Sequence, residues 1–241
     1  MQKKVGIIGA MDVEVKTLKS VLLPLPDESS VRTTVAGGCE FYEGLLDGVA
    51  VVVVKSGVGK VNAALCAQRL VIQFGVTHVI NTGIAGAMAS GLKVLDFVAS
   101  TDALYHDMDA TGFGYKACEV PQMECSDFPA DKKMLDAATI AFASLKEAKG
   151  HELIAGRIAT GDQFISDKEI KKHIREICNP ACVEMEGAAI AHACYLNGIP
   201  FVIIRCMSDM ADDMQENAYN FNEGTAAELS AALVRNMIPL F

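Results

Sequence analysis

The sequence lacks the features that mark proteins which bind nucleic acids or span membranes. Lysine and arginine number 21 against 30 aspartates and glutamates, so the formal net charge is -9, and the basic residues are scattered along the chain. This charge would repel a nucleic-acid backbone and an anionic lipid surface. No segment approaches the roughly 18 uninterrupted apolar residues that a membrane helix needs. We therefore expect neither nucleic acid nor membrane among its partners.

Closely spaced cysteine pairs are also missing. The eight cysteines form no CxxC pair, and none has the spacing to histidine that is typical of zinc sites. Several lie in apolar segments, where a free cysteine packs as a small hydrophobic side chain. Because disulfides persist mainly in oxidising compartments, we expect reduced, structural thiols and a cytoplasmic location.

No proline-rich, glycine/serine-rich or single-charge block interrupts the chain as a linker would. Hydrophobic residues make up 51% of the 241 residues, and a chain of this length can bury a substantial core. We expect residues 1–241 to form a single globular domain.

Short β-branched runs recur along the chain, and longer segments with helical spacing lie between several of them. The expected strands are 5–8, 49–54, 78–81, 97–100, 153–159 and 201–205. The expected helices are 60–74, 131–146, 167–177, 186–197 and 224–237. This alternation predicts an α/β fold with a largely parallel sheet between helices. The consecutive apolar residues of 49–54 predict an interior strand that is covered on both faces.

Ligands of such sheets bind at the carboxyl ends of the strands. The segments that follow expected strands are GAMDVE, KSGVGK, NTGIAGA, ATGDQFI and RCMSDMADD. KSGVGK is not a phosphate-binding P-loop, because Val54 and Val61 occupy the positions of the required glycine and Ser/Thr. The Gly-x-x-Gly of NTGIAGA is equally compatible with an ordinary tight turn.

Acidic side chains gather at these strand ends. Glu184 and Glu186 precede an apolar run, Glu14 follows the first strand, and Asp209 ends the apolar strand that contains Arg205. Glu186 could serve only to stabilise the N-terminus of the following helix. Burial at the end of an apolar strand would favour the protonated form of an acid. Two carboxylates in different environments can divide the acid and base roles at a glycosidic bond.

Seven motifs closely resemble, in order, those of bacterial 5'-methylthioadenosine/S-adenosylhomocysteine nucleosidases. They are GIIGAMDVEV, KSGVGKVNAA, NTGIAGA, YHDMDATGFGY, TGDQFI, VEMEGAAIAH and VIIRCMSDMAD, and they span residues 6–212. The resemblance implies a three-layer α/β/α sandwich around a mixed, twisted sheet, similar to the purine nucleoside phosphorylases. It also implies a homodimer that hydrolyses the N-ribosidic bond of both nucleosides to adenine and a 5-thioribose product, with no metal or other cofactor.

The resemblance further implies a role for each site residue. Glu14 would activate water, Asp209 would protonate adenine N7, and Glu186 would hold the ribose 2' and 3' hydroxyls. The other implied substrate-binding residues are Met11, Ile84, Ala85, Gly86, Phe164, Ile165, Glu184, Met185, Arg205, Ser208 and Tyr219. The partner subunit would close the 5'-alkylthio pocket with Ala110, Phe113 and Pro121.

Within this set, Phe164 would stack on adenine and Ile165 would bind it through the backbone. Arg205 would orient the nearby carboxylates, and Ser208 would support Asp209. Met11 and Met185 would contact the ribose and the thioalkyl group, although core filling explains a methionine equally well without the motifs. Tyr219 stands where the family usually carries phenylalanine.

The chain departs from the family pattern at several points. Ile84 replaces a frequent Ser or Thr, Leu95 replaces a glycine, and residues 118–127 apart from Pro121 follow no assignable pattern. The preferred 5' substituent therefore stays open.

Three alternative functions also stay open. A phosphorylase of the same fold would need Arg or Lys around the phosphate. A nucleosidase for aminodeoxyfutalosine or futalosine could use the same carboxylates. The third alternative is a non-catalytic nucleoside-binding or storage protein, which would have no use for a base that activates water.

Overall fold

The computed structural model describes residues 2–211 and 216–241, with the backbone alone for 216–221. The strands are β1 (Lys4–Gly9), β2 (Arg32–Ala36), β3 (Cys39–Leu46), β4 (Val49–Lys55), β5 (His78–Ala87), β6 (Phe97–Tyr105), β7 (Phe128–Pro129), β8 (Leu153–Thr160), β9 (Cys182–Glu184) and β10 (Phe201–Asp209). The α-helices are α1 (Asp12–Ser20), α2 (Lys60–Ile72), α3 (Lys132–Ser144), α4 (Lys168–Cys178), α5 (Gly187–Asn197) and α6 (Glu216–Met237). None of the described helices is long and apolar enough to cross a membrane.

The strands form one mixed sheet in the order β10-β6-β8-β9-β5-β1-β4-β3-β2, with β7 beside β6. Because β5 also pairs with β10, the strands β5, β10, β6, β8 and β9 pair in a closed ring, and the other central strands extend from it. Pairings such as β1–β4 and β5–β10 are parallel, whereas β3–β4, β6–β10 and β5–β9 are antiparallel. The expectation of a largely parallel sheet was therefore wrong, and the mixed sheet implied by the resemblance is confirmed.

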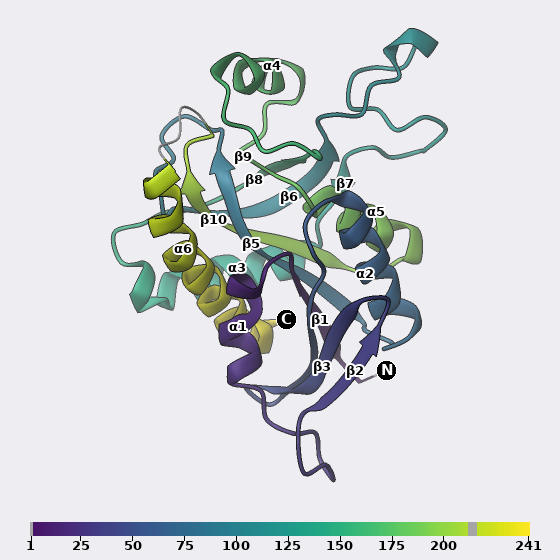
Figure 1. The fold of residues 1–241 in the computed structure, drawn as a ribbon, viewed down its shortest axis with the longest axis vertical. Helices are drawn as coiled ribbons and strands as arrows, with labels where there is room; N and C mark the ends of the chain where they lie inside the picture. The colour runs from purple at the N-terminus through teal and green to yellow at the C-terminus, as the bar shows by residue number, and fades with distance from the viewer. Residues whose placement is uncertain (1, 212–215) are drawn as a thin grey trace.

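Helices cover both faces of the sheet (Figure 1). Helices α1 and α3 contact α6 on one side, and α2 contacts α5 on the other. Side chains of the central strands alternate between the two resulting cores. Ile7 and Val53 belong to the core that contains residues of α1, α3 and α6, whereas Ile8 and Val54 belong to the core with α2 and α5. The prediction that 49–54 is an interior strand covered on both faces is confirmed, and the fold is a three-layer α/β/α sandwich.

Helix α1 was not predicted, because the apolar run of β1 continues into the alternating DVEV. The structure ends β1 at Gly9 and begins α1 at Asp12. The Glu14 carboxylate reaches back to accept a hydrogen bond from the backbone N–H of Met11 at 2.9 Å, as in a capping box. Helix α6 likewise begins at Glu216, earlier than the expected 224.

The parallel strands place several loops at one edge of the sheet. Strands β4 and β5 run parallel to β1, and β10 runs parallel to β5. Their carboxyl ends therefore point the same way, and the loops and helix starts that follow them meet at that edge. The candidate site residues that follow β1 and those near the ends of β5 and β10 come together there.

The two-sided core generates a prediction about stability. Ile7 is fully buried on β1, whereas Ile140 on α3 is 62% exposed. Ile7→Ala should lower the free energy of unfolding by about 2–5 kcal/mol, since it leaves a cavity in a packed core. The matched change Ile140→Ala should stay within about 0.5 kcal/mol. Urea denaturation at one protein concentration checks both, and similar losses in the two variants would contradict the described core.

Candidate active site

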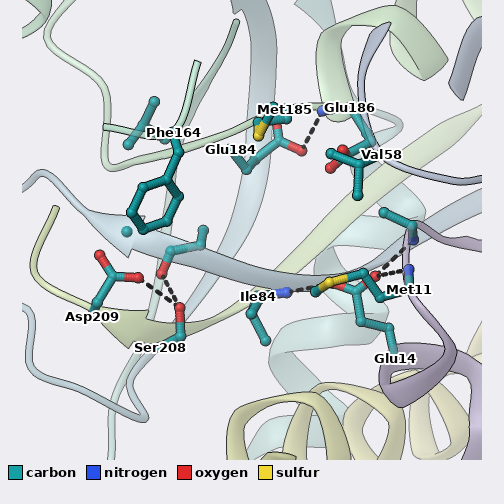
Figure 2. Close-up of a pocket in the computed structure, with 14 residues that line it drawn as sticks. Met11, Glu14, Val58, Ile84, Phe164, Glu184, Met185, Glu186, Ser208 and Asp209 are labelled. Carbon is teal, nitrogen blue, oxygen red and sulfur yellow. Dashed lines mark hydrogen bonds between the residues drawn. The ribbon is translucent and has the colours of Figure 1, made fainter. Parts of the chain in front are cut away.

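A cavity opens at the edge where β1, β5, β9 and β10 end (Figure 2). The residues that line it are Ala10, Met11, Glu14, Val58, Ile84, Ala85, Gly86, Phe164, Val183, Glu184, Met185, Glu186, Ser208 and Asp209. A smaller hollow shares the wall around Phe164 and adds Ile165. The structure thus brings together most of the residues that the motifs singled out, although they come from five separate stretches of the chain.

Glu14 is held rigidly at one side of this cavity. Its Oε2 accepts hydrogen bonds from the backbone N–H groups of Ala10 at 2.6 Å and Met11 at 2.9 Å, and its Oε1 accepts one from Ile84 at 3.1 Å. Burial raises the pKa of Glu14, although the charge of Arg205 and the three N–H groups oppose the rise. An ionised carboxylate has about four acceptor positions, so these three bonds leave it able to accept another proton donor.

Arg205 lies on β10 and is 1% exposed. Its Nη2 donates to the Oδ1 of Asn81 at 2.6 Å and also to Glu184. The Glu184 carboxylate accepts further bonds from Thr160 and from the N–H of Gly187 at 2.7 Å. Although Glu184 lines the cavity, its oxygens are thus engaged mainly with the protein, which suits a carboxylate that fixes Arg205.

Glu186 lies at the start of α5 and is 6% exposed. Its Oε1 accepts a hydrogen bond from the backbone N–H of Gly59 at 2.9 Å, and its Oε2 is 3.8 Å from the Nη2 of Arg205. Burial raises the pKa of Glu186 to about 7, and the charge of Glu184 adds to this rise. Glu186 therefore changes its charge near neutral pH.

Gly83 allows the two charged groups behind the cavity to approach each other. A Cβ atom at this position would lie 2.2 Å from the Nη1 of Arg205 and 2.3 Å from the Oε1 of Glu14. Both distances are too short for any side chain. The glycine of the NTGIAGA segment therefore has a specific structural role, because it leaves the space in which the guanidinium faces the carboxylate.

Asp209 lies across the cavity from Glu14 (Figure 2). It is 8% exposed. Its Oδ2 accepts a hydrogen bond from the Ser208 hydroxyl at 2.7 Å, and its Oδ1 accepts one from the N–H of Ala211 at 2.7 Å. The expected support of Asp209 by Ser208 is therefore present in the structure.

Apolar side chains form the walls between these carboxylates. Phe164 and Met185 lie between Asp209 and Glu186 in Figure 2, and Met11 covers Glu14. Phe164 is 55% exposed, whereas Ile165 is 4% exposed. A cavity with apolar walls and a few fixed carboxylates is typical of binding sites for small molecules that also carry polar groups.

The three residues assigned to a partner's pocket do not line this cavity. Ala110, Phe113 and Pro121 lie in the long connection between β6 and β7, which extends away from the rest of the molecule (Figure 1). Phe113 is 89% exposed. The side chain of Tyr219 lies outside the described residues.

Two of the departures from the family pattern, Ile84 and Leu95, keep a backbone hydrogen bond in the structure. Ile84 contacts Glu14 through its backbone N–H, a bond that any side chain preserves, while its own side chain lines the cavity. Leu95 has φ 70, in the left-handed region, which is why a glycine suits this position. Its N–H still donates to the carbonyl of Met207 at 2.8 Å.

Sequence reasoning missed several contributors to the site. Asn81 and Thr160 bind Arg205 and Glu184 from inside strands, and Gly59 binds Glu186 through its backbone. Val58 lines the cavity within the KSGVGK segment. That segment was considered as a P-loop and as part of one family motif, and neither interpretation assigned a role to Val58 or Gly59. Within the described part of the chain, no group of three or more His, Cys, Asp or Glu side chains could hold a metal ion.

Comparison with known proteins places this chain in a family. Residues 4–239 match the model of the phosphorylase superfamily. The 5'-methylthioadenosine/S-adenosylhomocysteine nucleosidase of Psychromonas ingrahamii is 42% identical over 98% of both chains. The crystal structure of the nucleosidase of the same name from Colwellia psychrerythraea, in complex with adenine, is 39% identical with a TM-score of 0.92 over 100% of this chain and 96% of that one.

A futalosine hydrolase of Helicobacter pylori is also similar, with 26% identity and a TM-score of 0.90 over 99% of this chain and 98% of that one. The higher identities and the match along nearly the whole chain decide the assignment. This chain belongs to the phosphorylase superfamily and, within it, to the 5'-methylthioadenosine/S-adenosylhomocysteine nucleosidases.

Proposed function

We propose that this chain hydrolyses the N-ribosidic bond of 5'-methylthioadenosine and S-adenosylhomocysteine, releasing adenine and the 5-thioribose product. The observation that carries the proposal is the pair of buried acids Glu14 and Asp209, which face one cavity from opposite sides. The 42% identity to a nucleosidase with this name supports the choice of substrates.

In the proposed mechanism, Glu14 acts as the general base. It takes a proton from water while the water oxygen forms a bond to C1' of the ribose. Its raised pKa makes it a better proton acceptor than an ordinary carboxylate, and Arg205 keeps its ionised form accessible. Asp209 acts as the general acid. It gives a proton to adenine N7 as the electrons of the C1'–N9 bond move onto the base, so that adenine leaves as a neutral molecule.

The remaining residues orient the substrate. Glu186 accepts hydrogen bonds from the 2' and 3' hydroxyls when it is ionised, and Gly59 fixes one of its oxygens at 2.9 Å. Phe164 stacks on the adenine ring, and Ile165 binds adenine through its backbone. Met11 and Met185 contact the ribose and the alkylthio group.

We also propose a homodimer in which the partner subunit completes the 5'-alkylthio pocket with its Ala110, Phe113 and Pro121. Two helices that contact each other, α2 and α5, carry exposed apolar side chains suited to such an interface. They include Val61 at 70%, Leu65 at 61% and Leu196 at 65% exposure. A cytoplasmic location fits the eight free cysteines, six of which are buried.

Two rival activities differ from this proposal, one in the nucleoside and the other in the nucleophile. Futalosine-type nucleosides are a second candidate, because a futalosine hydrolase shares the fold with a TM-score of 0.90. Phosphorolysis is less compatible with the site. Among the described residues that line the cavity, four are carboxylates and none is lysine or arginine, whereas a phosphate nucleophile needs basic donors.

One assay tests the function. Purified protein is incubated with methylthioadenosine, adenosylhomocysteine, aminodeoxyfutalosine and inosine, with and without phosphate, and the sugar product is identified. Free sugar from the first two nucleosides in phosphate-free buffer is the expected result. A sugar phosphate formed only with phosphate would mean a phosphorylase, and binding without any product would mean a non-catalytic protein.

Glu14→Gln should abolish most hydrolysis and preserve nucleoside binding, because the amide fills nearly the same volume and cannot take a proton from water. We expect kcat to fall by on the order of 10² to 10⁴. Glu43→Gln is the matched control, since Glu43 is also buried and instead pairs with Lys4 at 2.7 Å. Near-normal turnover of the Glu14 variant would remove this residue from the mechanism.

Asp209→Asn should bind methylthioadenosine with similar affinity and lose on the order of 10² to 10⁴ in kcat, the usual contribution of a general acid. A nitrophenyl riboside, whose leaving group departs without N7 protonation, should lose far less. Asp96→Asn provides the control, because this buried aspartate accepts backbone hydrogen bonds away from the cavity. Equal losses on both substrates would mean that Asp209 is structural.

Phe113→Ala should raise KM for both substrates unequally. The fold-increase should be about 10 times larger for methylthioadenosine than for adenosine, which lacks the methylthio group that the ring would cover. Leu23→Ala, at another exposed apolar position (61%), should change neither. Sedimentation of the wild-type protein establishes the oligomeric state. Equal effects on both substrates, or a fully active monomer, would overturn the shared site.

A further inference from the structure

Three charged residues outside the cavity join three of the loops around it. The Nζ of Lys60 lies 2.7 Å from the Oδ2 of Asp107 and 3.5 Å from the Oδ2 of Asp162. Two backbone N–H groups also donate hydrogen bonds between these residues. The N–H of Lys60 donates to Asp162 at 2.9 Å, and the N–H of Asp162 donates to Asp107 at 3.0 Å. We call these three residues the Lys60 cluster; none of them lines the cavity.

Two residues of the Lys60 cluster, Lys60 and Asp162, are close in sequence to residues of the site. Gly59, which immediately precedes Lys60, donates its N–H to Glu186 at 2.9 Å. Phe164 follows Asp162 by two residues and lines the cavity. Gly59 has φ 96, which suits glycine, and it has no side chain of its own to fix its peptide. Its neighbours must therefore hold it in place.

The cluster is partly shielded from solvent, so its ion pair is stronger than an ordinary surface pair. The side chains of Lys60 and Asp107 are 25% and 20% exposed, and that of Asp162 is 50% exposed. Burial raises the pKa of Asp107, but the hydrogen bonds from Lys60 and Asp162 outweigh it, and the net pKa is lowered. Tyr105 and His106 are the other titratable groups nearby.

A second lysine in the same motif provides a contrast. The Nζ of Lys55 lies 2.7 Å from Asp12, but both side chains are well exposed, at 46% and 67%. This pair is near the cavity in sequence and makes no contact with Gly59 or Asp162 among the described interactions. It is a lysine–aspartate pair of equal length that lacks the connection to Glu186.

We propose that Lys60 is a positioning residue which, through Asp107 and Asp162, holds the Gly59 N–H against Glu186 and so fixes the carboxylate that grips the ribose. The inference rests on the proposed role of Glu186. The Gly59 N–H occupies one oxygen of Glu186, and the other oxygen, 3.8 Å from the Nη2 of Arg205, stays available for the ribose.

Loss of this arrangement has a predictable electrostatic effect. The Gly59 hydrogen bond lowers the pKa of Glu186, as does Arg205, whereas burial, Glu184 and Glu14 raise it to about 7. If Gly59 moves away, the pKa of Glu186 rises further. A smaller fraction of the protein then carries ionised Glu186 at neutral pH. The acidic limb of the kcat/KM profile therefore moves to higher pH.

The experiment compares Lys60→Met, Lys60→Arg and Lys55→Met with methylthioadenosine and its 2',3'-dideoxy analogue as substrates. Lys60→Met should lose on the order of 10- to 100-fold in kcat/KM for methylthioadenosine, the scale of a misplaced binding group. It should lose much less for the dideoxy analogue, and its acidic limb should shift upward. Lys60→Arg should recover most of the activity, and Lys55→Met should stay within about twofold of wild type.

Asp107→Asn provides an independent test of the Lys60 cluster. It should change the substrate preference in the same direction as Lys60→Met, and the double variant should be little worse than either single variant, because both changes break one ion pair. Thermal unfolding is recorded for every variant. If Lys60→Met does not fold, Lys60→Arg and Asp107→Asn still measure the substrate preference and the pH profile.

The outcomes separate this inference from the proposed function. Wild-type protein that leaves methylthioadenosine intact contradicts the function itself. Active wild-type protein whose Lys60→Met variant loses equally on both substrates, or keeps an unshifted acidic limb, overturns the positioning role and leaves the function standing. Additive losses in the double variant would also overturn it.

Discussion

The guanidinium of Arg205 makes the polar interior of this protein possible. Glu14, Glu184 and Glu186 are all buried around it, and buried carboxylates are costly without a paired charge. One positive charge cannot compensate three negative ones. Glu184 takes the closest contact, so the other two acids are only partly compensated, and their pKa values are raised. The unequal sharing of one cation therefore sets the chemistry available to each acid.

The two sides of the cavity hold their acids in different ways. Glu14 receives three backbone N–H groups, which fix both its position and its rotamer. Asp209 receives one N–H and the rotatable hydroxyl of Ser208. A hydroxyl can donate to an ionised carboxylate or accept from a protonated one. The Ser208 hydroxyl can thus remain bonded to either form of the Asp209 carboxyl group, which suits the proposed role of Asp209 as a proton donor.

Sequence reasoning recovered the parts of this design that depend on side-chain type. The consecutive apolar residues of 49–54 indicated an interior strand, and acids placed after apolar strands indicated the site. Backbone contributions gave no such signal, because every residue except proline carries the N–H that Gly59 and Ile84 use. Asn81 was hidden within a strand, since its partner Arg205 comes from a distant part of the chain. The closed ring of strands depends on that same long-range pairing, which periodicity alone cannot reveal.

If Glu186 binds the ribose as proposed, its pKa also links ligand binding to the protonation of the solvent. At a pH close to 7, many molecules carry a proton on this carboxyl group. A nucleoside that binds through the ionised form expels this proton into the buffer, so its affinity strengthens as the pH rises through this region and then levels off. The heat measured on binding consequently contains the ionisation enthalpy of the buffer, and two buffers at the same pH would report different enthalpies for one binding event.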